Sequence, residues 1–238
     1  MKYMDYICDS CEFITVELLD RIEKAREGCE TLGIGVYSDE LVQSQVNRRP
    51  LRPYEERAKI MSYIKGVDFV FEVTDESSIE IKKEDFYYNN PKTKKYKIGY
   101  APGTYDLLHQ GHIEHLTEAI SQCEILIVGI NDDDLVQSYK NKKPLMSAEI
   151  RANIVSKLKF VDATFIADTL ERRKANEWIK KKYGSPIDAV FIGSDWVGQD
   201  LHNAENLNIV FTYRDPEKAK TRSSTFYRQQ LSEQQENI

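Results

Sequence analysis

Several features that mark other classes of protein are scarce in this sequence. Only four of its 238 residues are cysteine, too few for a dense disulfide framework, which agrees with a reducing compartment. The most apolar run, "ILIVGI" at 125–130, is far too short to cross a bilayer, and the N-terminal "MKYMDYICDS" lacks the apolar core of a signal peptide. We therefore expect a cytoplasmic protein without membrane insertion.

Basic residues are also in the minority. The chain carries 33 Lys and Arg against 39 Asp and Glu, a formal net charge of −6. Broad binding of nucleic acid or of an anionic membrane needs a basic surface that displaces counterions, so the composition argues against both. Any site for phosphate groups must therefore be local.

The cysteines show one suggestive spacing. Cys8 and Cys11 are separated by two residues, as in some redox and zinc motifs, but no second Cys/His pair at ligand spacing accompanies them. We expect Cys8, Cys11, Cys29 and Cys123 to be buried thiols, and we predict no metal site built from protein side chains.

The chain does contain an internal repeat at an offset of 94 residues. Residues 29–68 align without a gap on residues 123–162, and 20 of these 40 positions are identical. Such similarity indicates two copies of one supersecondary unit. We predict a degenerate, truncated and non-catalytic copy at 1–88, a polar linker at 89–96 and a complete catalytic copy at 97–238.

The second copy alternates apolar runs with helical patterns. This alternation is typical of a parallel sheet with helices on both faces, so we predict an α/β, Rossmann-like fold. In such sheets ligands bind outside the carboxyl ends of the strands. The predicted strands are 97–101, 125–130, 163–167, 188–193 and 208–213, and the predicted helices are 109–121, 147–159, 170–182 and one beginning near Ser224.

The stretch "GTYDLLHQGH" at 103–112 follows the first of these strands and opens the first helix. A helix N-terminus has unpaired N–H groups and a partial positive charge, so it attracts phosphate. His109 and His112 share one helix face and can donate to the same phosphate oxygens, while Gly111 lets the backbone approach a ligand. The alternative is that one of these two histidines caps the helix and the other is solvated. We interpret His115, one turn further along, as solvated helix surface.

This stretch resembles the G-T-F-D-x-x-H-x-G-H signature of the cytidylyltransferase branch of the HxGH nucleotidyltransferase superfamily. It is most similar to glycerol-3-phosphate cytidylyltransferases, with the ethanolamine-phosphate and choline-phosphate enzymes next. Three further segments resemble the family in order: "NKKPLMSAEIR" at 141–151 its lysine loop and Glu-x-Arg helix, "FIGSDWVG" at 191–198 its G-x-D-W segment, and "RSST" at 222–225 its Ser-Thr tail. Four ordered motifs are much more specific than one.

The resemblance implies transfer of CMP from CTP to a small phosphorylated alcohol, with release of pyrophosphate and formation of a CDP-alcohol. The acceptor phosphate attacks the α-phosphorus directly, so catalysis rests on positioning and on stabilising the developing charge. His109 and His112 would hold the triphosphate, and Lys140 and Lys142 would neutralise the phosphates around the exchanged bond. The implied nucleotide-binding residues are Gly103, Thr104, Tyr105, Asp106, Gly111, Arg151, Gly193, Asp195, Trp196, Arg214, Arg222, Ser223, Ser224 and Thr225.

The tail departs from the family pattern. The family has Arg-Thr-x-Gly-Ile directly before Ser-Thr, whereas here seven residues separate Arg214 from Arg222, which touches the motif. The sequence leaves open which arginine meets the triphosphate. A divalent ion, Mg²⁺, is expected with the nucleoside triphosphate, bound mainly through phosphates and water.

The first copy lacks the residues to which the resemblance gives catalytic roles. At the 94-residue offset the two histidines fall on Thr15 and Leu18, and the glycine between them falls on Glu17. A carboxylate repels a triphosphate and a leucine cannot donate to one, so we expect this copy to be catalytically dead. We predict that it packs on the second copy as an intramolecular pseudo-dimer, replacing the second subunit of the homodimer usual in the family; a further homo-oligomer is left open.

Two other functions stay open. An adenylyltransferase of the same superfamily would use ATP, because the HxGH and Ser-Thr motifs bind phosphates and do not identify the base; the "GSDWVG" segment favours CTP. A non-catalytic nucleotide-binding regulatory protein is the other alternative. The second copy argues against it, because it retains all the proposed catalytic residues that the first copy lacks. The sequence offers no residue that separates a glycerol from an ethanolamine acceptor.

Overall fold

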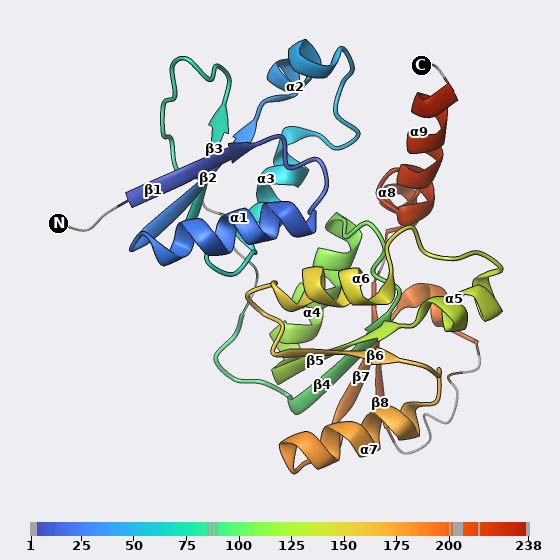
Figure 1. Cartoon of the computed structure of the whole chain (residues 1–238). Coiled ribbons are helices and arrows are strands. Elements are labelled where there is room, and N and C mark those ends of the chain that lie inside the picture. Colours follow the sequence, from blue (N-terminus) through green and yellow to red (C-terminus); the bar gives the residue numbers. More distant parts are fainter. Residues whose placement is uncertain are drawn as a thin grey trace. The chain divides into compact units, whose positions relative to one another are not determined.

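The computed structural model describes residues 4–84, 86, 88, 90–199, 201, 207–213 and 215–236. The chain divides into two compact units, one formed by Met1–Tyr87 with Gln229–Ile238 and the other by Tyr88–Arg228. Each unit is built on a parallel β-sheet flanked by helices (Figure 1). The predicted α/β, Rossmann-like fold class is confirmed.

The first unit has a three-stranded sheet in the order β1-β2-β3, with every neighbouring pair parallel. Its central strand is an almost continuous buried run, as expected for a strand that is covered on both faces. The elements are β1 (Met4–Asp9), α1 (Val16–Glu27), β2 (Thr31–Tyr37), α2 (Asp39–Val46), α3 (Tyr54–Ser62) and β3 (Phe69–Val73).

The second unit has a five-stranded parallel sheet in the order β6-β5-β4-β7-β8. The chain ends with two helices that follow the last strand. The elements are β4 (Tyr96–Gly103), α4 (Gln110–Gln122), β5 (Cys123–Asn131), α5 (Asp133–Lys140), α6 (Ala148–Ser156), β6 (Ala163–Ala167), α7 (Arg172–Tyr183), β7 (Ala189–Gly193), the 3₁₀ turn η1 (Ser194–Trp196), β8 (Asn208–Thr212), α8 (Pro216–Thr221) and α9 (Ser224–Glu236). Helix α9 begins in the second unit, and its residues from Gln229 onward belong to the first.

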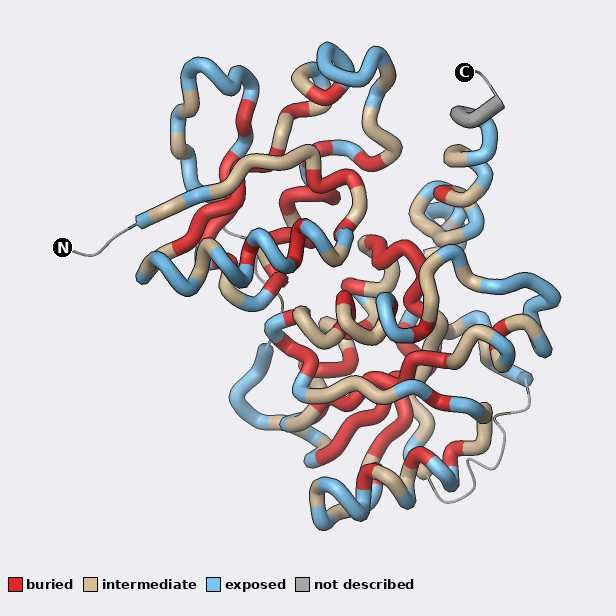
Figure 2. The backbone as a smooth tube through the Cα atoms, in the orientation of Figure 1, coloured by how far each residue is buried: buried red, intermediate tan, exposed pale blue. Residues whose placement is uncertain are grey.

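Helices cover both faces of the second sheet. On one face, Ala175 and Ile179 of α7 pack against Ile98 and Val190 of the central strands in one buried apolar cluster. On the other face lie α4 and α6 (Figure 1). Figure 2 shows the buried residues concentrated along the strands, so each sheet forms the core of its own unit.

The strand order of the second sheet reverses at β4. The chain runs from β4 outward to β5 and β6, and then crosses back to place β7 and β8 on the other side. At such a switch point the loops that leave two adjacent strands diverge and open a crevice at the carboxyl edge of the sheet. The loops after β4 and β7 therefore frame the position where a ligand would bind.

The predicted strands and long helices of the second copy correspond to observed elements, whereas α5 was not predicted. This helix has only two turns and buries a single residue, Val136, so it carries no recurring apolar pattern. Asp132 caps it, accepting hydrogen bonds from the amides of Asp134 and Leu135. The capping aspartate was the feature of the sequence from which this helix could have been predicted.

The two units share local structure at the 94-residue offset. Helices α2 and α3 and strand β3 have the same lengths as α5, α6 and β6, and their bounds differ by 94 at both ends. Asn47 and Asn141 end α2 and α5 in the same left-handed conformation, with φ of 54° and 53°. Within the described residues the first unit has no strands that correspond to β7 and β8.

All four cysteines are free thiols. Cys11 and Cys123 are buried, but Cys8 and Cys29 are only partly so, and the expectation of four buried thiols is wrong for that pair. Burial raises the pKa of the Cys11 thiol well above its ordinary value, which keeps it protonated and unreactive. Among the described helices, none is both long and apolar enough to cross a bilayer.

Candidate active site

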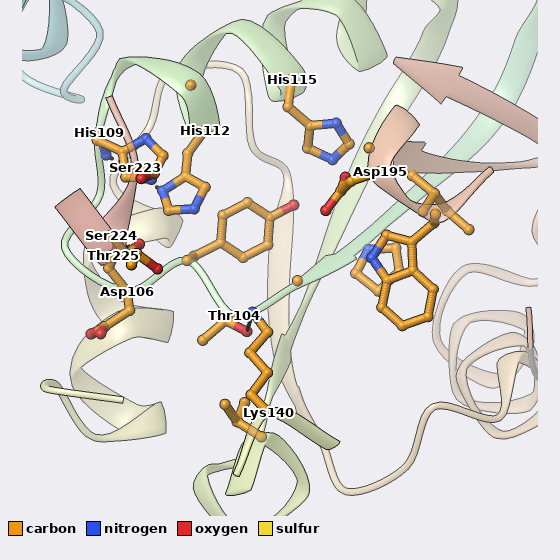
Figure 3. A pocket seen from close by; sticks show the side chains of 18 of the residues that line it. Thr104, Asp106, His109, His112, His115, Lys140, Asp195, Ser223, Ser224 and Thr225 are labelled. Atoms are coloured by element: carbon orange, nitrogen blue, oxygen red, sulfur yellow. Dashed lines mark hydrogen bonds between the residues drawn. The ribbon is translucent and has the colours of Figure 1, made fainter. Parts of the chain in front are cut away.

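A cavity of about 340 Å³ lies at the switch point between β4 and β7 (Figure 3). Its walls come from the loop after β4, the first turns of α4, the loop after α5, the η1 turn, the end of β8 and the start of α9. The predicted site residues that it brings together are Gly103, Thr104, Tyr105, Asp106, His109, Gly111, His112, Lys140, Lys142, Gly193, Asp195, Trp196, Ser223, Ser224 and Thr225.

Three predicted residues are not in this wall. Arg222 directly precedes the wall residues of the tail but is not among the residues that line the cavity. Arg214 lies outside the described residues. Arg151 is fully buried beneath the site, and its guanidinium group donates to the carbonyl oxygen of Thr104 and to the carboxylate of Asp133. Arg151 therefore supports the loop after β4 from below and does not line the cavity.

His109 is the N-cap residue of α4 and His112 lies in the first turn of the helix; their rings stack, with centroids 3.7 Å apart. His109 is buried, and its backbone N–H donates to Nδ1 of His112 at 3.4 Å. Because Nδ1 accepts this bond, the proton of the neutral His112 ring belongs on Nε2. His112 is thus oriented as a hydrogen-bond donor at the positive end of a helix.

Gly111 leaves room for this packing. A Cβ atom at this position would lie 3.2 Å from the His109 ring and 3.4 Å from the carbonyl oxygen of Arg222. The glycine therefore lets the C-terminal tail approach the two histidines. In Figure 3, Ser223, Ser224 and Thr225 lie on the same side of the cavity as His109 and His112.

The two predicted lysines reach the cavity from the last residue of α5 and from the loop after it. The Lys140 ammonium group donates to Oγ1 of Thr104 at 3.0 Å, and that of Lys142 donates to Oγ1 of Thr225 at 3.4 Å. Both lysines are exposed, so these weak contacts can be exchanged for a ligand. Asn141 between them adopts the left-handed conformation, which turns the chain sharply at the end of the helix.

Asp106 ties three of these segments together. Its buried carboxylate accepts from the amides of Leu145 and Met146, at 3.0 and 3.1 Å, and pairs with Arg228 of α9 at 2.5 Å. Its carbonyl oxygen accepts from the Ser224 hydroxyl at 2.7 Å. Arg228 also lines the cavity, and no motif in the sequence pointed to it.

The other end of the cavity is less rich in cations. Asp195 and Trp196 of η1 reach it together with Ile192, Thr212 and Tyr213, at the ends of β7 and β8. A Cβ atom on Gly193 would lie 2.4 Å from the Asp195 carboxylate, so the Asp195 side chain can occupy this position only because residue 193 has no side chain. The cavity thus runs from a donor-rich end to an end with aromatic and apolar walls.

His115 also lines the cavity, so the prediction from the sequence that it is solvated helix surface is wrong. Its Nδ1 lies 2.6 Å from Oγ1 of Thr212, and in Figure 3 its ring faces Asp195. Burial lowers the pKa of His115 to about 4, against the opposing effect of Asp195. The ring is therefore neutral at physiological pH. Its position three residues after His112 was the signal available in the sequence.

The donor set fits phosphate better than a caged metal. Among the described residues no group of three or more His, Cys, Asp or Glu side chains is placed to hold an ion. The imidazole, ammonium and hydroxyl donors around His112 instead match the oxygens of a phosphate chain.

The first unit has a cavity at the corresponding position, and two of its carboxylates, Asp9 and Glu12, are paired with arginines. Arg21 pairs with Asp9 at 2.6 Å, and Arg48 makes a two-pronged pair with Glu12 at 2.7 and 2.9 Å. At the 94-residue offset Glu12 corresponds to Asp106 and Arg48 to Lys142. A guanidinium group held by a carboxylate in this way is occupied before any phosphate arrives.

The fold and the cavity together define a Rossmann-like protein with a donor-lined cavity at the carboxyl edge of its second sheet. The family profile described as "Cytidylyltransferase-like" matches residues 100–230, which is more than half of the chain. The chain belongs to this family, within the nucleotidyltransferase superfamily.

Individual relatives cover only parts of the chain. It is 39% identical over 74 residues to the bifunctional protein HldE of Hyphomonas neptunium, a match that spans 31% of this chain and 15% of the relative. The HldE protein of Aliarcobacter butzleri is 35% identical over 117 residues, 48% of this chain and 24% of the relative. The chain thus spans a quarter or less of these relatives.

A solved structure, the lipopolysaccharide core biosynthesis protein from Thermoplasma volcanium, is also similar. It is 22% identical, with a TM-score of 0.40, and the match covers 50% of this chain and 96% of that one.

Proposed function

We propose that the chain is a cytidylyltransferase, which transfers CMP from CTP to a small phosphorylated alcohol and releases pyrophosphate. One observation carries this proposal: two imidazoles, two ammonium groups and a set of hydroxyls converge on one cavity from segments up to 116 residues apart, from His109 to Thr225. Family membership supports it, because the matched region, 100–230, contains all of them.

The donor-rich end suits the triphosphate. Nε2 of His112, the N-terminus of α4 and the start of α9 supply donors for phosphate oxygens, and Lys142 sits beside Thr225 at the same end. These groups stabilise charge that grows on the α-phosphate and on the leaving pyrophosphate during attack by the acceptor. Direct attack needs no nucleophile from the protein.

A divalent cation fits this scheme as part of the substrate. Mg²⁺ bound to the triphosphate supplies neutralisation of the phosphate oxygens. The cavity residues bind the phosphates and leave the ion to phosphate and water ligands.

The base belongs at the opposite end, near Trp196 and Tyr213, where the wall offers aromatic faces for stacking. The "GSDWVG" segment at 193–198, which resembles the G-x-D-W segment of cytidylyltransferases, favours cytosine over adenine. ATP stays the alternative nucleotide, because the groups at the phosphate end do not distinguish bases.

Pyrophosphate release tests the proposal. CTP and ATP are compared in the presence of glycerol 3-phosphate, phosphoethanolamine and phosphocholine. We expect release that depends on both CTP and a phosphorylated alcohol, whereas release with ATP alone among the nucleotides identifies an adenylyltransferase. If no combination of nucleotide and acceptor releases pyrophosphate, the catalytic proposal is wrong.

The first unit has a different role in this proposal. Its paired charges, Arg21 with Asp9 and Arg48 with Glu12, support a copy that binds no triphosphate. Its packing on the second unit as a pseudo-dimer stays a prediction.

A further inference from the structure

A second cavity of about 320 Å³ adjoins the first. Both cavities are lined by Thr104 and Lys140 on one side and by Asp195 and Trp196 on the other. Beyond this shared boundary the second cavity has its own polar residues, Asn131, Tyr139, Arg172 and Gln199, beside the apolar Leu170. The proposed function gives no role to any of them.

Arg172, the first residue of α7, is the unusual member of this wall. Its side chain is 3% exposed, and within the part of the chain that the structure describes its Nε has no hydrogen-bond partner. An arginine remains charged in proteins, and a buried N–H donor without a hydrogen-bond partner destabilises a fold. Packing of the core therefore does not explain this residue, whereas a ligand that accepts hydrogen bonds does.

Asn131 complements Arg172. Its side chain is 4% exposed, its Nδ2 donates to the Tyr139 hydroxyl at 2.9 Å, and its Oδ1 has no partner among the described residues. The second cavity therefore offers a buried cationic donor and a buried neutral acceptor. A hydroxyl group can accept from the first and donate to the second.

The same wall is connected to the reacting centre. The Tyr139 hydroxyl lies 3.2 Å from Oγ1 of Thr104, which also accepts from Lys140 at 3.0 Å. Asn131 is thus linked through two hydroxyl groups to the lysine on the boundary between the cavities. A phosphate placed at Lys140 could extend its substituent into the second cavity while facing the triphosphate in the first.

We propose that the second cavity holds the acceptor, and that Arg172 and Asn131 select a polyhydroxylated one, a polyol or sugar phosphate, over a phosphorylated amino alcohol. The inference rests on the proposed function, because the first cavity then accounts for the whole nucleotide. A primary or quaternary ammonium group would meet the positive charges of Arg172 and Lys140. Asp195, the one carboxylate in the described wall, faces His115 in the first cavity (Figure 3).

The test combines an acceptor panel with two variants of the full chain. Initial rates are measured with glycerol 3-phosphate, a hexose 1-phosphate, phosphoethanolamine and phosphocholine at saturating nucleotide. In Arg172→Met we expect the KM for the preferred hydroxylated acceptor to rise about 10- to 100-fold, the range for losing a hydrogen bond to a charged group, while the KM for the nucleotide changes by less than about twofold. Discrimination against phosphoethanolamine should fall at the same time.

Arg173→Met is the matched control, since the side chain of Arg173 is 75% exposed and pairs only loosely with Glu177 at 3.9 Å. It should leave all four acceptors unchanged. The melting temperature separates function from structure: removal of a buried donor that has no hydrogen-bond partner should leave it unchanged or raise it in Arg172→Met. A lower melting temperature, with equal losses for nucleotide and acceptor, would make Arg172 a structural residue and overturn the inference.

The outcomes also separate this inference from the proposed function. Pyrophosphate release confined to the amino alcohols, or a nucleotide KM that rises in Arg172→Met in place of the acceptor KM, overturns the inference and leaves the transferase standing. Absence of release with every nucleotide and acceptor overturns both.

Discussion

Arg57 and Arg151, separated by 94 residues, make equivalent buried contacts in the two units. Both are fully buried, and Nε donates to the carbonyl oxygen five residues earlier, Arg52 at 2.9 Å and Met146 at 3.0 Å. Each guanidinium group also pairs with a carboxylate at the start of the preceding helix, Asp39 or Asp133, at 2.5 Å. The arginine is therefore scaffold in both units, and in the second unit it supports Thr104, which lines the candidate site.

Arg151→Met tests this difference in role between the two arginines, with Arg57→Met as the matched control. Each variant should lose about 3 kcal/mol of unfolding free energy, because it leaves a carboxylate and a backbone carbonyl without their buried donor. Arg151→Met should in addition lower kcat/KM, because Arg151 holds the carbonyl of Thr104, whose hydroxyl accepts from Lys140. Urea unfolding and pyrophosphate release measure the two effects.

An equal loss of activity in Arg57→Met, measured where both variants are fully folded, would contradict this difference in role. It would mean that the first unit supports the reaction through its own scaffold.

The parts of the site that the sequence predicts are those encoded locally. His109 and His112 fall on one face of a helix directly after a strand, so spacing alone places them beside each other. Arg228 could not be found in this way, because its partner Asp106 lies 122 residues earlier and the pair forms only when α9 folds back on the loop after β4. His115 was misread for a related reason: its partner Thr212 is 97 residues away, at the end of another strand.

The fold class followed from the alternation of strands and helices, but the position of the cavity depends on strand order. Periodicity does not reveal that β7 returns to the side of β4 opposite β5. That crossover places Asp195 and Trp196 opposite the first turns of α4. Arg172 shows the same limit, since only the three-dimensional structure shows that the start of α7 is buried against an open cavity.

His109→Ala and His112→Ala should each lower kcat by about 100- to 1,000-fold, because each removes a donor aimed at charge that develops in the transition state. The KM for CTP should change little, since the lysines and the tail of α9 still bind the phosphates. Steady-state kinetics of pyrophosphate release measures both constants. Gln110→Ala, between the two histidines, is the control, because the Gln110 amide donates to Glu114 on the helix surface.

A purely structural role for the histidines makes a different prediction. Both substitutions would then lower the melting temperature and leave kcat per folded molecule near the wild-type value.

His115 should make stability depend on pH. Burial lowers its pKa from 6.5 to about 4, so between these values the unfolded chain binds a proton that the folded chain does not. Stability therefore falls as pH drops through this window, and each unit of pKa difference is worth about 1.4 kcal/mol at most. Because the ring is partly accessible, we expect a loss of about 2 kcal/mol from His115 between pH 7 and pH 4.5.

His115→Gln, which does not titrate, provides the comparison. Urea unfolding at pH 7 and pH 4.5 should show a smaller pH-dependent loss in the variant than in the wild type, by about the 2 kcal/mol assigned to the imidazole. An identical loss in both proteins would mean that His115 titrates with an ordinary pKa.

The number of nucleotides bound per chain tests the contrast between the cavity of the first unit and the donor-rich cavity of the second. Isothermal titration calorimetry with a non-hydrolysable CTP analogue and Mg²⁺ should give one site per chain, because Arg48 and Arg21 are already paired with carboxylates in the first unit. Lys142→Ala should weaken this binding about tenfold, the cost of one charge-assisted contact, whereas Arg48→Ala, at the corresponding position, should leave affinity and stoichiometry unchanged. Two sites per chain, with one lost in Arg48→Ala, would show that the first unit still binds nucleotide. In that case the ion pairs would open for a ligand, and the first copy would be a second nucleotide site that lacks the histidines for chemistry.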